Sequence, residues 1–221
     1  MSTPAEELVD QLAGALHGTG HPATQPWLFR PLLRLLAEGE PVALDRLADA
    51  AGTSVDQVRQ ALAAEPDTEY DADGRVVGLG LTQNPTPHRV ETNGRTLYGW
   101  CAMDTLMFPL ILQRPVRVIS TCPATRTAIR LTAEPERVTD LDPATAVVSQ
   151  VPAPEGACGV RASVCDQGHF FASAQAATDW QHQHPESVVL PVADGHRFGR
   201  RLLEALFSAD AATGAPALRQ E

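Results

Sequence analysis

The first part of the chain has the apolar spacing of amphipathic helices. Leucine and valine recur at helical spacing over residues 6–16, and apolar residues recur in the same way over 27–39. Glycines and prolines interrupt the chain between these two segments, and Gly39 ends the second one. The pattern therefore predicts two helices, each with one buried face.

A third helical segment continues into a helix-turn-helix pattern. Residues 41–64 contain an amphipathic run, a turn at Gly52, and Ser54 as the N-cap of a further helix. Two short β-type runs over 68–81 then flank an Asp-Gly pair at 73–74, which is a strong hairpin signal. A helix-turn-helix followed by a hairpin predicts a winged-helix-like domain over residues 1–83.

The rest of the chain mixes short strands with helices, after a Pro-containing stretch at 83–87 that marks the expected boundary. Strands are predicted over 88–92, 115–120, 127–132, 144–151, 169–173 and 187–192. Helices are predicted over 97–112, 174–184 and 196–209. The first of these is apolar on every side, as expected of a buried helix, and should kink or end near Pro109.

These elements do not alternate in the βαβα order of a parallel sheet. The prediction is an α+β fold, in which a winged-helix-like N-terminal domain (1–83) precedes a mixed α+β core with antiparallel strands (84–221). Residues 152–164 should form a loop rich in proline and glycine, with a short helical turn as an option. The tail 210–221 is expected to fray.

The sequence also indicates where in the cell the protein is located and whether its cysteines are reduced. No apolar run approaches the roughly 20 residues needed to cross a bilayer. The N-terminus is acidic and lacks the basic start and apolar stretch of a secretory signal. These observations predict a cytoplasmic protein, in which thiols are kept reduced. The four cysteines are then either small buried side chains or groups for chemistry and soft-metal binding.

The distribution of charge argues against nucleic acid as a partner. The net charge is −10, and residues 1–83 carry five arginines against thirteen acidic residues. The would-be recognition helix, 54–64, offers only Arg59 against Asp56. A DNA-binding surface needs positive charge to neutralise phosphates, so the sequence disfavours DNA binding. A structural or substrate-covering role for this domain is preferred.

Cys101 and Asp104 are the first candidates for chemistry. They stand three residues apart in the predicted buried helix, so both side chains lie on one face. A carboxyl in an apolar helix without an adjacent cation should have a raised pKa and hold a proton near neutral pH. The alternative is that Asp104 caps a backbone turn or pairs with a distant arginine, and the spacing alone leaves this open.

Cys165 is the third candidate, at the end of the predicted loop and just before the strand 169–173. A cysteine at such a junction can meet a helical cysteine across a pocket. Two thiolates suit a soft ion such as mercury. A carbon bound to that mercury then needs a proton to leave as a hydrocarbon, and an adjacent carboxylic acid supplies one.

Two segments resemble motifs of a known family. The segment 97–109 reads LYGWCAMDTLMFP and resembles the core motif of the alkylmercury lyases, and 163–173 reads SVCDQGHFFAS and resembles their second motif. The hairpin region 68–82 and the region that begins at residues 179–180 are also similar, so the resemblance covers roughly residues 25–208. It implies an organomercurial lyase in which Cys101 and Cys165 bind mercury, with Asp104 beside the metal to handle the proton.

The resemblance also has implications for the cofactors and partners of the enzyme. Mercury is both substrate and product, and nothing is oxidised or reduced, so no cofactor is expected. An external small thiol is needed for turnover, and a small thiol or a mercuric reductase would remove the Hg²⁺. The expected partners are an organomercurial and small thiols, with no membrane.

The chain departs from the family pattern beside the second motif. Asp166 stands where some members have a second cysteine, so an auxiliary thiol is missing. Cys158 is extra and is interpreted as an incidental loop cysteine, with mercury exchange at the mouth as the alternative. Cys122 is expected to be structural. His169 is expected to be a hydrogen-bonded strand residue, because the cysteine spacings fit no common zinc pattern.

Three rival functions remain at this stage. A metal-sensing winged-helix regulator would bind DNA, which the acidic domain opposes. A soft-metal-binding protein without lyase activity would hold mercury and release no hydrocarbon. A cysteine hydrolase would need a histidine beside Cys101, and nothing in the sequence places one there.

Overall fold

A computed structural model describes residues 2–154 and 159–208 of the chain. The helices are α1 (Pro4–Thr19), α2 (Pro26–Leu36), α3 (Leu44–Ala51), α4 (Val55–Leu62), α5 (Ala102–Leu112), α6 (Thr178–Gln183) and α7 (Val192–Ser208). Short 3-10 turns are η1 (Pro22–Thr24), η2 (Cys165–Gln167) and η3 (Gln175–Ala177). None of these described helices combines the length and apolar character needed to cross a membrane.

The described strands form two antiparallel sheets. The larger contains β1 (Glu69–Tyr70), β2 (Val76–Leu79), β3 (Leu81–Thr82), β4 (His88–Thr92), β5 (Arg95–Gly99), β6 (Val116–Thr121), β7 (Ala128–Ala133) and β8 (Val138–Asp142), in the order β1-β2-β3-β5-β4-β6-β7-β8. The smaller contains β9 (Val147–Gln150), β10 (Phe170–Phe171) and β11 (Val188–Pro191), with β9 in the middle. A helical N-terminal part followed by an antiparallel core confirms the predicted α+β class.

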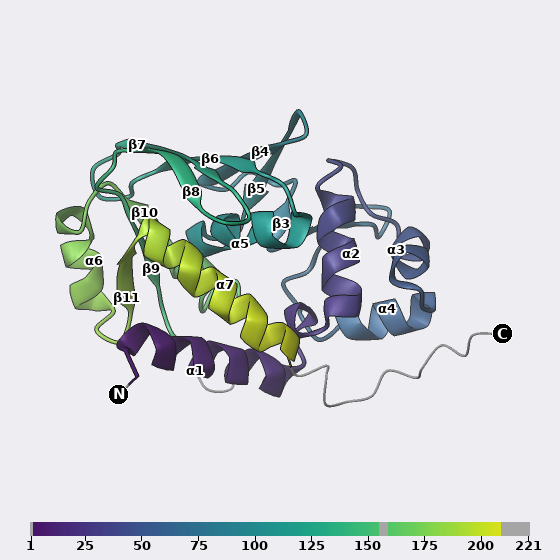
Figure 1. The fold of residues 1–221 in the computed structure, drawn as a ribbon. Coiled ribbons are helices and arrows are strands. Elements are labelled where there is room, and N and C mark those ends of the chain that lie inside the picture. The colour runs from purple at the N-terminus through teal and green to yellow at the C-terminus, as the bar shows by residue number, and fades with distance from the viewer. Residues whose placement is uncertain (1, 155–158, 209–221) are drawn as a thin grey trace.

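The helix-turn-helix and its hairpin are present as predicted. Gly52 takes φ 66° at the end of α3, a left-handed conformation that glycine adopts without strain. Ser54 then caps α4 by accepting a hydrogen bond from the Gln57 N–H. Strands β1 and β2 flank Gly74, and α3 and α4 lie together at one end of the molecule (Figure 1).

The hairpin does not stand apart from the core, because its last strand continues the large sheet. In that sheet β3 pairs with β5, and Leu81 lies opposite Gly99. The sheet therefore runs through the boundary expected at residues 83–84, and the division into 1–83 and 84–221 stays a prediction.

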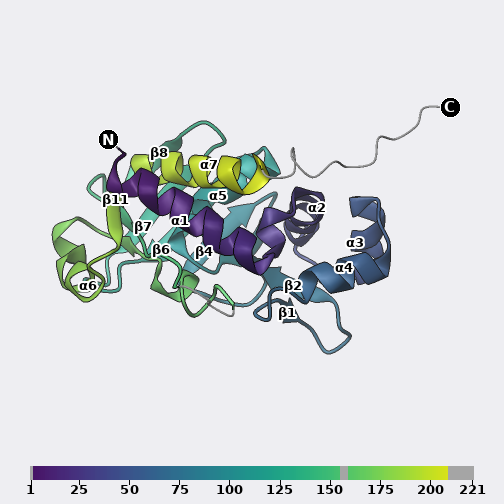
Figure 2. The same cartoon turned by 90° about the horizontal axis from the view of Figure 1, so that it is seen from below.

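Helix α5 is the centre of the core. Its side chains Ala102, Thr105 and Leu106 have no exposed surface, and the helix packs against α2, α7, β6 and β9. Helix α7 lies across α5, and α1 runs alongside α7, as both views show (Figures 1 and 2). The N-terminal end of α5 is thus enclosed by segments from both ends of the chain.

The structure corrects four details of the predicted elements. Residues 97–99 belong to β5 and not to the buried helix, which begins only at Ala102. Pro109 lies inside α5 without ending it, and α7 starts at Val192 rather than at 196. Strand β8 was not predicted, because its pattern of half-buried and exposed residues lacks a regular apolar alternation. The tail 210–221 lies outside the described residues.

Candidate functional site

The site is built on the first turn of α5. Cys101 is the N-cap residue, with extended backbone at φ −133° and ψ 171°. The Asp104 N–H donates to Cys101 Sγ over 3.2 Å, and the Cys101 N–H donates to Asp104 Oδ2 over 3.1 Å. This reciprocal capping box usually uses a hydroxyl and a longer acid. Here it fixes a thiol and a carboxyl side by side at a helix start.

The second thiol comes from the turn that leads into η2. The Cys165 N–H donates to the Val160 carbonyl over 3.0 Å, which closes a short helical turn in the described part of the predicted loop. The Gly168 carbonyl accepts from the Ala102 N–H over 3.1 Å and so ties this turn to α5. One ligand atom from each of Cys101, Asp104 and Cys165 lies within 4.8 Å of the other two. The structure thus brings the three predicted site residues together.

Burial shapes the ionisation of all three groups. Cys101 and Cys165 are 4% and 8% exposed, and burial raises the pKa of the Cys101 thiol. Its hydrogen bond with Cys101, burial and the Asp104 charge raise the pKa of Cys165 well above its ordinary value. Burial also raises the pKa of Asp104, although the Cys101 thiol and backbone N–H oppose the shift. The resting site therefore favours protonated thiols and a carboxyl that readily holds a proton.

These groups face a small cavity of about 80 Å³. Its walls are mostly apolar and come from helices α1, α2, α5 and α7, the β2–β3 turn and the loop before η2. The lining residues are Leu12, Leu16, His21, Ala23, Phe29, Leu79, Gly80, Trp100, Cys101, Met103, Asp104, Met107, Gln150, Ala153, Val160, Val164, Cys165, Leu202, Leu203 and Leu206. Trp100 is buried and Met107 is partly buried against the core, and both also line this cavity.

A wider, open cavity of about 690 Å³ adjoins the site cavity. The two share Leu16, Ala153 and Val160 as walls, so the open cavity lies directly beside the chamber that contains the thiols. Asp10 and Glu65 are among its other lining residues.

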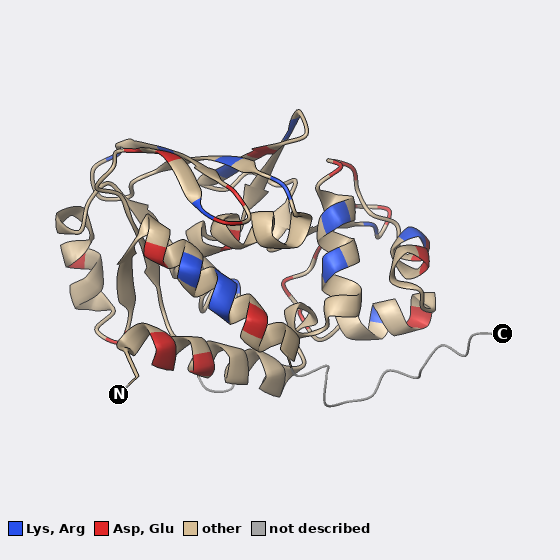
Figure 3. Ribbon diagram, in the orientation of Figure 1, with Lys and Arg blue, Asp and Glu red and all other residues tan. Residues whose placement is uncertain are grey.

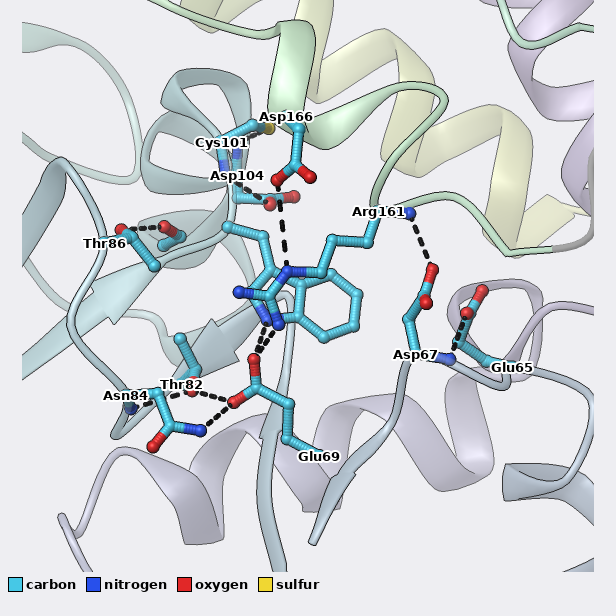
Figure 4. A network of polar contacts seen from close by, with 12 residues as sticks. Glu65, Asp67, Glu69, Thr82, Asn84, Thr86, Cys101, Asp104, Arg161 and Asp166 are labelled. Carbon is cyan, nitrogen blue, oxygen red and sulfur yellow. Dashed lines mark hydrogen bonds and ion pairs between the residues drawn. The ribbon is translucent and has the colours of Figure 1, made fainter.

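A polar network holds the second thiol's loop against the hairpin (Figure 4). The Arg161 guanidinium is ion-paired with Glu69 and lies 5.0 Å from the centre of the Trp100 ring. Glu69 also accepts hydrogen bonds from Trp100 Nε1 at 3.1 Å and from Asn84 Nδ2 at 2.7 Å. One carboxylate thus connects the residue before Cys101 with the loop that carries Cys165.

A second set of contacts anchors the same loop to the end of α4. The Arg161 N–H donates to Asp67 Oδ2 over 3.0 Å, and the Asp67 N–H donates to Glu65 Oε1 over 2.8 Å (Figure 4). The buried His21 places its Nε2 3.1 Å from Glu65 Oε2. Sequence reasoning missed all of these residues. The one available signal was Arg161, the single cation in the stretch 152–164.

The remaining candidates lie apart from this group. His169 stacks against the buried His88 with 6.4 Å between ring centres, and its N–H donates to Ser149 Oγ. Cys122 is fully buried in the β6–β7 turn. Cys158 lies outside the described residues. Within the described chain, the cluster of metal-ligating side chains is the one formed by Cys101, Asp104 and Cys165.

The arrangement allows one kind of chemistry above others. Two sulfurs can hold a soft ion in an apolar chamber, and a carboxyl beside them can pass a proton to a group on that ion. Among the described residues, no histidine contacts Cys101 in the way a cysteine hydrolase requires.

Comparison with known protein families and relatives agrees with this chemistry. The family model described as alkylmercury lyase matches residues 81–204, and the helix-turn-helix domain of alkylmercury lyase matches residues 7–80. The alkylmercury lyase of Streptomyces lividans is 52% identical over 214 residues, which cover 97% of this chain and 99% of that protein. The alkylmercury lyase of Staphylococcus epidermidis is 51% identical over 183 residues, covering 83% of this chain and 84% of that protein.

A solved structure extends the comparison to the fold. The crystal structure of the mercury-bound form of MerB2 has a TM-score of 0.73 and 26% sequence identity to this chain. The match covers 90% of this chain and 98% of the other. Both halves of the chain are therefore included in the likeness.

Proposed function

The chain belongs to the alkylmercury lyase family, and from that membership we propose that Cys101, Cys165 and Asp104 carry the cleavage of its carbon–mercury bond. The enzyme converts R–Hg⁺ to RH and Hg²⁺. The observation that supports these residues is their convergence, since two sulfurs and a carboxyl meet within 4.8 Å in a mostly apolar chamber. The mercury-bound state of the solved relative is consistent with a mercury site in this fold.

The first step is an exchange of thiols. The substrate enters as R–Hg–SR′, and one active-site cysteine takes mercury while its proton leaves on R′SH. The second cysteine then adds, and the Asp104 carboxylate accepts its proton. The raised pKa values of both thiols keep them protonated until mercury arrives, which makes proton removal a part of binding.

The second step is protonolysis. With two thiolates on mercury, electron density shifts toward the carbon, and Asp104 donates its proton to that carbon. RH leaves, Hg²⁺ stays on Cys101 and Cys165, and Asp104 returns to the carboxylate. The raised pKa of Asp104 suits this role, because a carboxyl whose pKa is raised by burial takes up the cysteine's proton more readily than an exposed one before donating it to carbon.

Nothing is oxidised or reduced in these steps, so the reaction requires an external thiol rather than a redox cofactor. The open cavity beside the site is the proposed exit for R′SH and the entry for the thiol that removes Hg²⁺. A small thiol or a mercuric reductase is the proposed acceptor of the metal. We place the reaction in the cytoplasm, because both sulfurs have to be free thiols.

The helix-turn-helix unit is proposed to cover the site rather than to bind DNA. Arg59 of α4 is 2.6 Å from Asp56, and Arg46 of α3 is 2.6 Å from Glu38, so both arginines are already paired. Acidic and basic positions alternate over α3 and α4, with no continuous basic face (Figure 3). Few unpaired arginines on α3 and α4 are therefore available to neutralise the phosphates of DNA.

Headspace gas chromatography tests the assignment of Asp104. The purified protein is incubated with methylmercury and excess thiol, and methane is measured above a control with thiol alone. Replacing Asp104 by Asn should lower methane release by at least about 100-fold, the range of a lost general acid and base. Methane release at the unchanged rate would rule out Asp104 as the acid.

A further inference from the structure

Three residues of the site follow one another along α5. Cys101, Asp104 and Met107 are spaced three apart, and all three line the cavity. Cys101 is the extended N-cap residue, and Asp104 and Met107 follow it along the helix axis at steps of about 4.5 Å. The cavity wall along α5 therefore runs from a proposed metal ligand through a proposed proton donor to an apolar side chain.

The two oxygens of Asp104 are not equivalent. Oδ2 accepts the Cys101 N–H and is turned toward the helix start. Oδ1 faces Gly80, since a β-carbon built on Gly80 would lie 3.9 Å from it. Because Oδ2 is engaged by a backbone N–H, Oδ1 is the freer oxygen to carry a proton toward a group in the cavity.

Gly80 forms a wall of the cavity that has no side chain. It lies between β2 and β3 at φ +72°, and its carbonyl accepts the Trp100 N–H over 2.8 Å. A β-carbon there would meet nothing closer than Asp104 Oδ1 and, at 4.0 Å, Phe108. Gly80 thus leaves room for about one methyl group beside Oδ1, and Met107 lines the cavity further along α5.

We propose that the organic group of the substrate is held between Gly80 and Met107, beside Asp104 Oδ1, and that Gly80 is a specificity-determining residue. The inference rests on the proposed function, which puts mercury on the two sulfurs and the proton on Asp104. The carbon that receives the proton has to lie within reach of Oδ1. With mercury at the start of α5, the rest of the group extends toward Met107.

The volume of the cavity predicts which groups fit. At about 80 Å³ it is smaller than the roughly 150 Å³ apolar cavity that is known to bind benzene. A methyl group fits without displacing the walls, whereas a phenyl group requires a side chain to move. Met107 is suited to this because methionine is flexible and unbranched. The space between Gly80 and Met107, called the seat below, therefore fits short alkyl groups without any movement of its walls.

The test compares kcat/KM for methylmercury and phenylmercury in matched pairs of variants. Gly80→Ala adds one methyl group beside Oδ1, and Gly74→Ala is its control. Gly74 has a similar φ of +76° and open space around its β-carbon, so it reproduces the backbone strain without touching the cavity. Met107→Ala enlarges the seat, and Leu110→Ala makes a similar truncation in α5 outside the cavity.

Gly80→Ala should raise the methyl-to-phenyl ratio of kcat/KM by about ten-fold or more, the scale for one methylene in a tight apolar pocket. Met107→Ala should lower the ratio, and both controls should leave it unchanged. Should Gly80→Ala fail to fold, the Met107 and Leu110 pair decides the question. Cleavage of both substrates with an unchanged ratio in the Met107 variant would overturn the seat alone. Cleavage of neither substrate by the unaltered protein would overturn the proposed function and the seat together.

Discussion

Gly168 lies directly against Cys101 across the site. A β-carbon on Gly168 would stand 3.0 Å from Cys101 Cβ and 3.5 Å from its sulfur. The backbone at Gly168 is ordinary, with φ −88°, so glycine is required here for space and not for conformation. The missing side chain is what allows η2 to bring the second thiol up to the start of α5.

Gly168→Ala should therefore separate the two sulfurs. The added methyl group would be closer to Cys101 than about nine in ten real β-carbon contacts, so η2 or the N-cap has to move by a few tenths of an ångström. We expect Hg²⁺ affinity to fall by about 10- to 100-fold, the range seen when metal ligands lose their support. Competition with a small dithiol measures it. Gly18→Ala, where nothing lies within 4 Å, is the control and should bind normally.

The two classes of buried cysteine should differ sharply on substitution. Cys165→Ser leaves mercury with one protein sulfur, so hydrocarbon release should fall to the background of the thiol-only reaction. Cys122→Ser changes a thiol that is fully buried in the β6–β7 turn, away from the cavity, and should keep its activity. Methane release by both variants is the measurement. Normal turnover by the Cys165 variant would remove that residue from the mechanism.

Breaking the contact between Arg161 and Glu69 should loosen the loop before Cys165. The Glu69 side chain is 11% exposed and that of Arg161 is 29% exposed, so Arg161→Ala leaves a poorly solvated carboxylate. We expect a loss of about 1–3 kcal/mol in unfolding free energy, together with lower activity. Arg59→Ala removes an exposed pair and should cost less than about 0.5 kcal/mol. Urea unfolding compares the two, and equal losses would contradict the anchoring role.

His88 should make the protein less stable as the pH falls. Burial, with the neighbouring His169, lowers the pKa of His88 from 6.5 to about 3. Between these values the unfolded chain binds a proton that the folded protein does not. Stability therefore rises with pH across this window and is lost on acidification, by about 1.4 kcal/mol per pH unit from this one group.

The matched variant isolates that contribution. His88→Phe removes the hydrogen bond to Ser120 Oγ, which is a constant loss at every pH, and it also removes the titrating ring. Urea unfolding at pH 7, 6 and 5 gives the unfolding free energy at each pH. As the pH falls, this free energy should decrease less for the variant than for the unaltered protein. Parallel declines would mean that His88 is protonated in the folded state.

Local signals explain why the helical half of the fold could be predicted. Ser54 and Gly52 mark the limits of α4 and α3 through capping and a left-handed turn, both of which depend on neighbouring residues. Residues 97–99 were assigned to a helix because a fully apolar run has no period that separates a buried strand from a buried helix. Their pairing with β3 and β4 is set by residues distant in sequence.

The residues of the candidate site also divide into those that the sequence could predict and those that it could not. The grouping of Cys101, Asp104 and Cys165 could be predicted because their motifs resemble a family, whereas their catalytic roles stay a prediction. Arg161, Glu69 and Gly80 could not be predicted, since their contacts join segments far apart in the chain. The sequence around a single arginine or glycine does not indicate which distant residues it will contact in the folded protein.

The capping box at the start of α5 has a consequence for the timing of catalysis. The sulfur of Cys101 accepts the Asp104 N–H, so the atom that begins the helix is also the atom offered to the metal. In the proposed mechanism Hg²⁺ binds this same sulfur, so metal binding withdraws electron density from the acceptor of the Asp104 N–H. The hydrogen exchange rate of the Asp104 backbone amide is therefore expected to change when mercury binds and to return when it leaves.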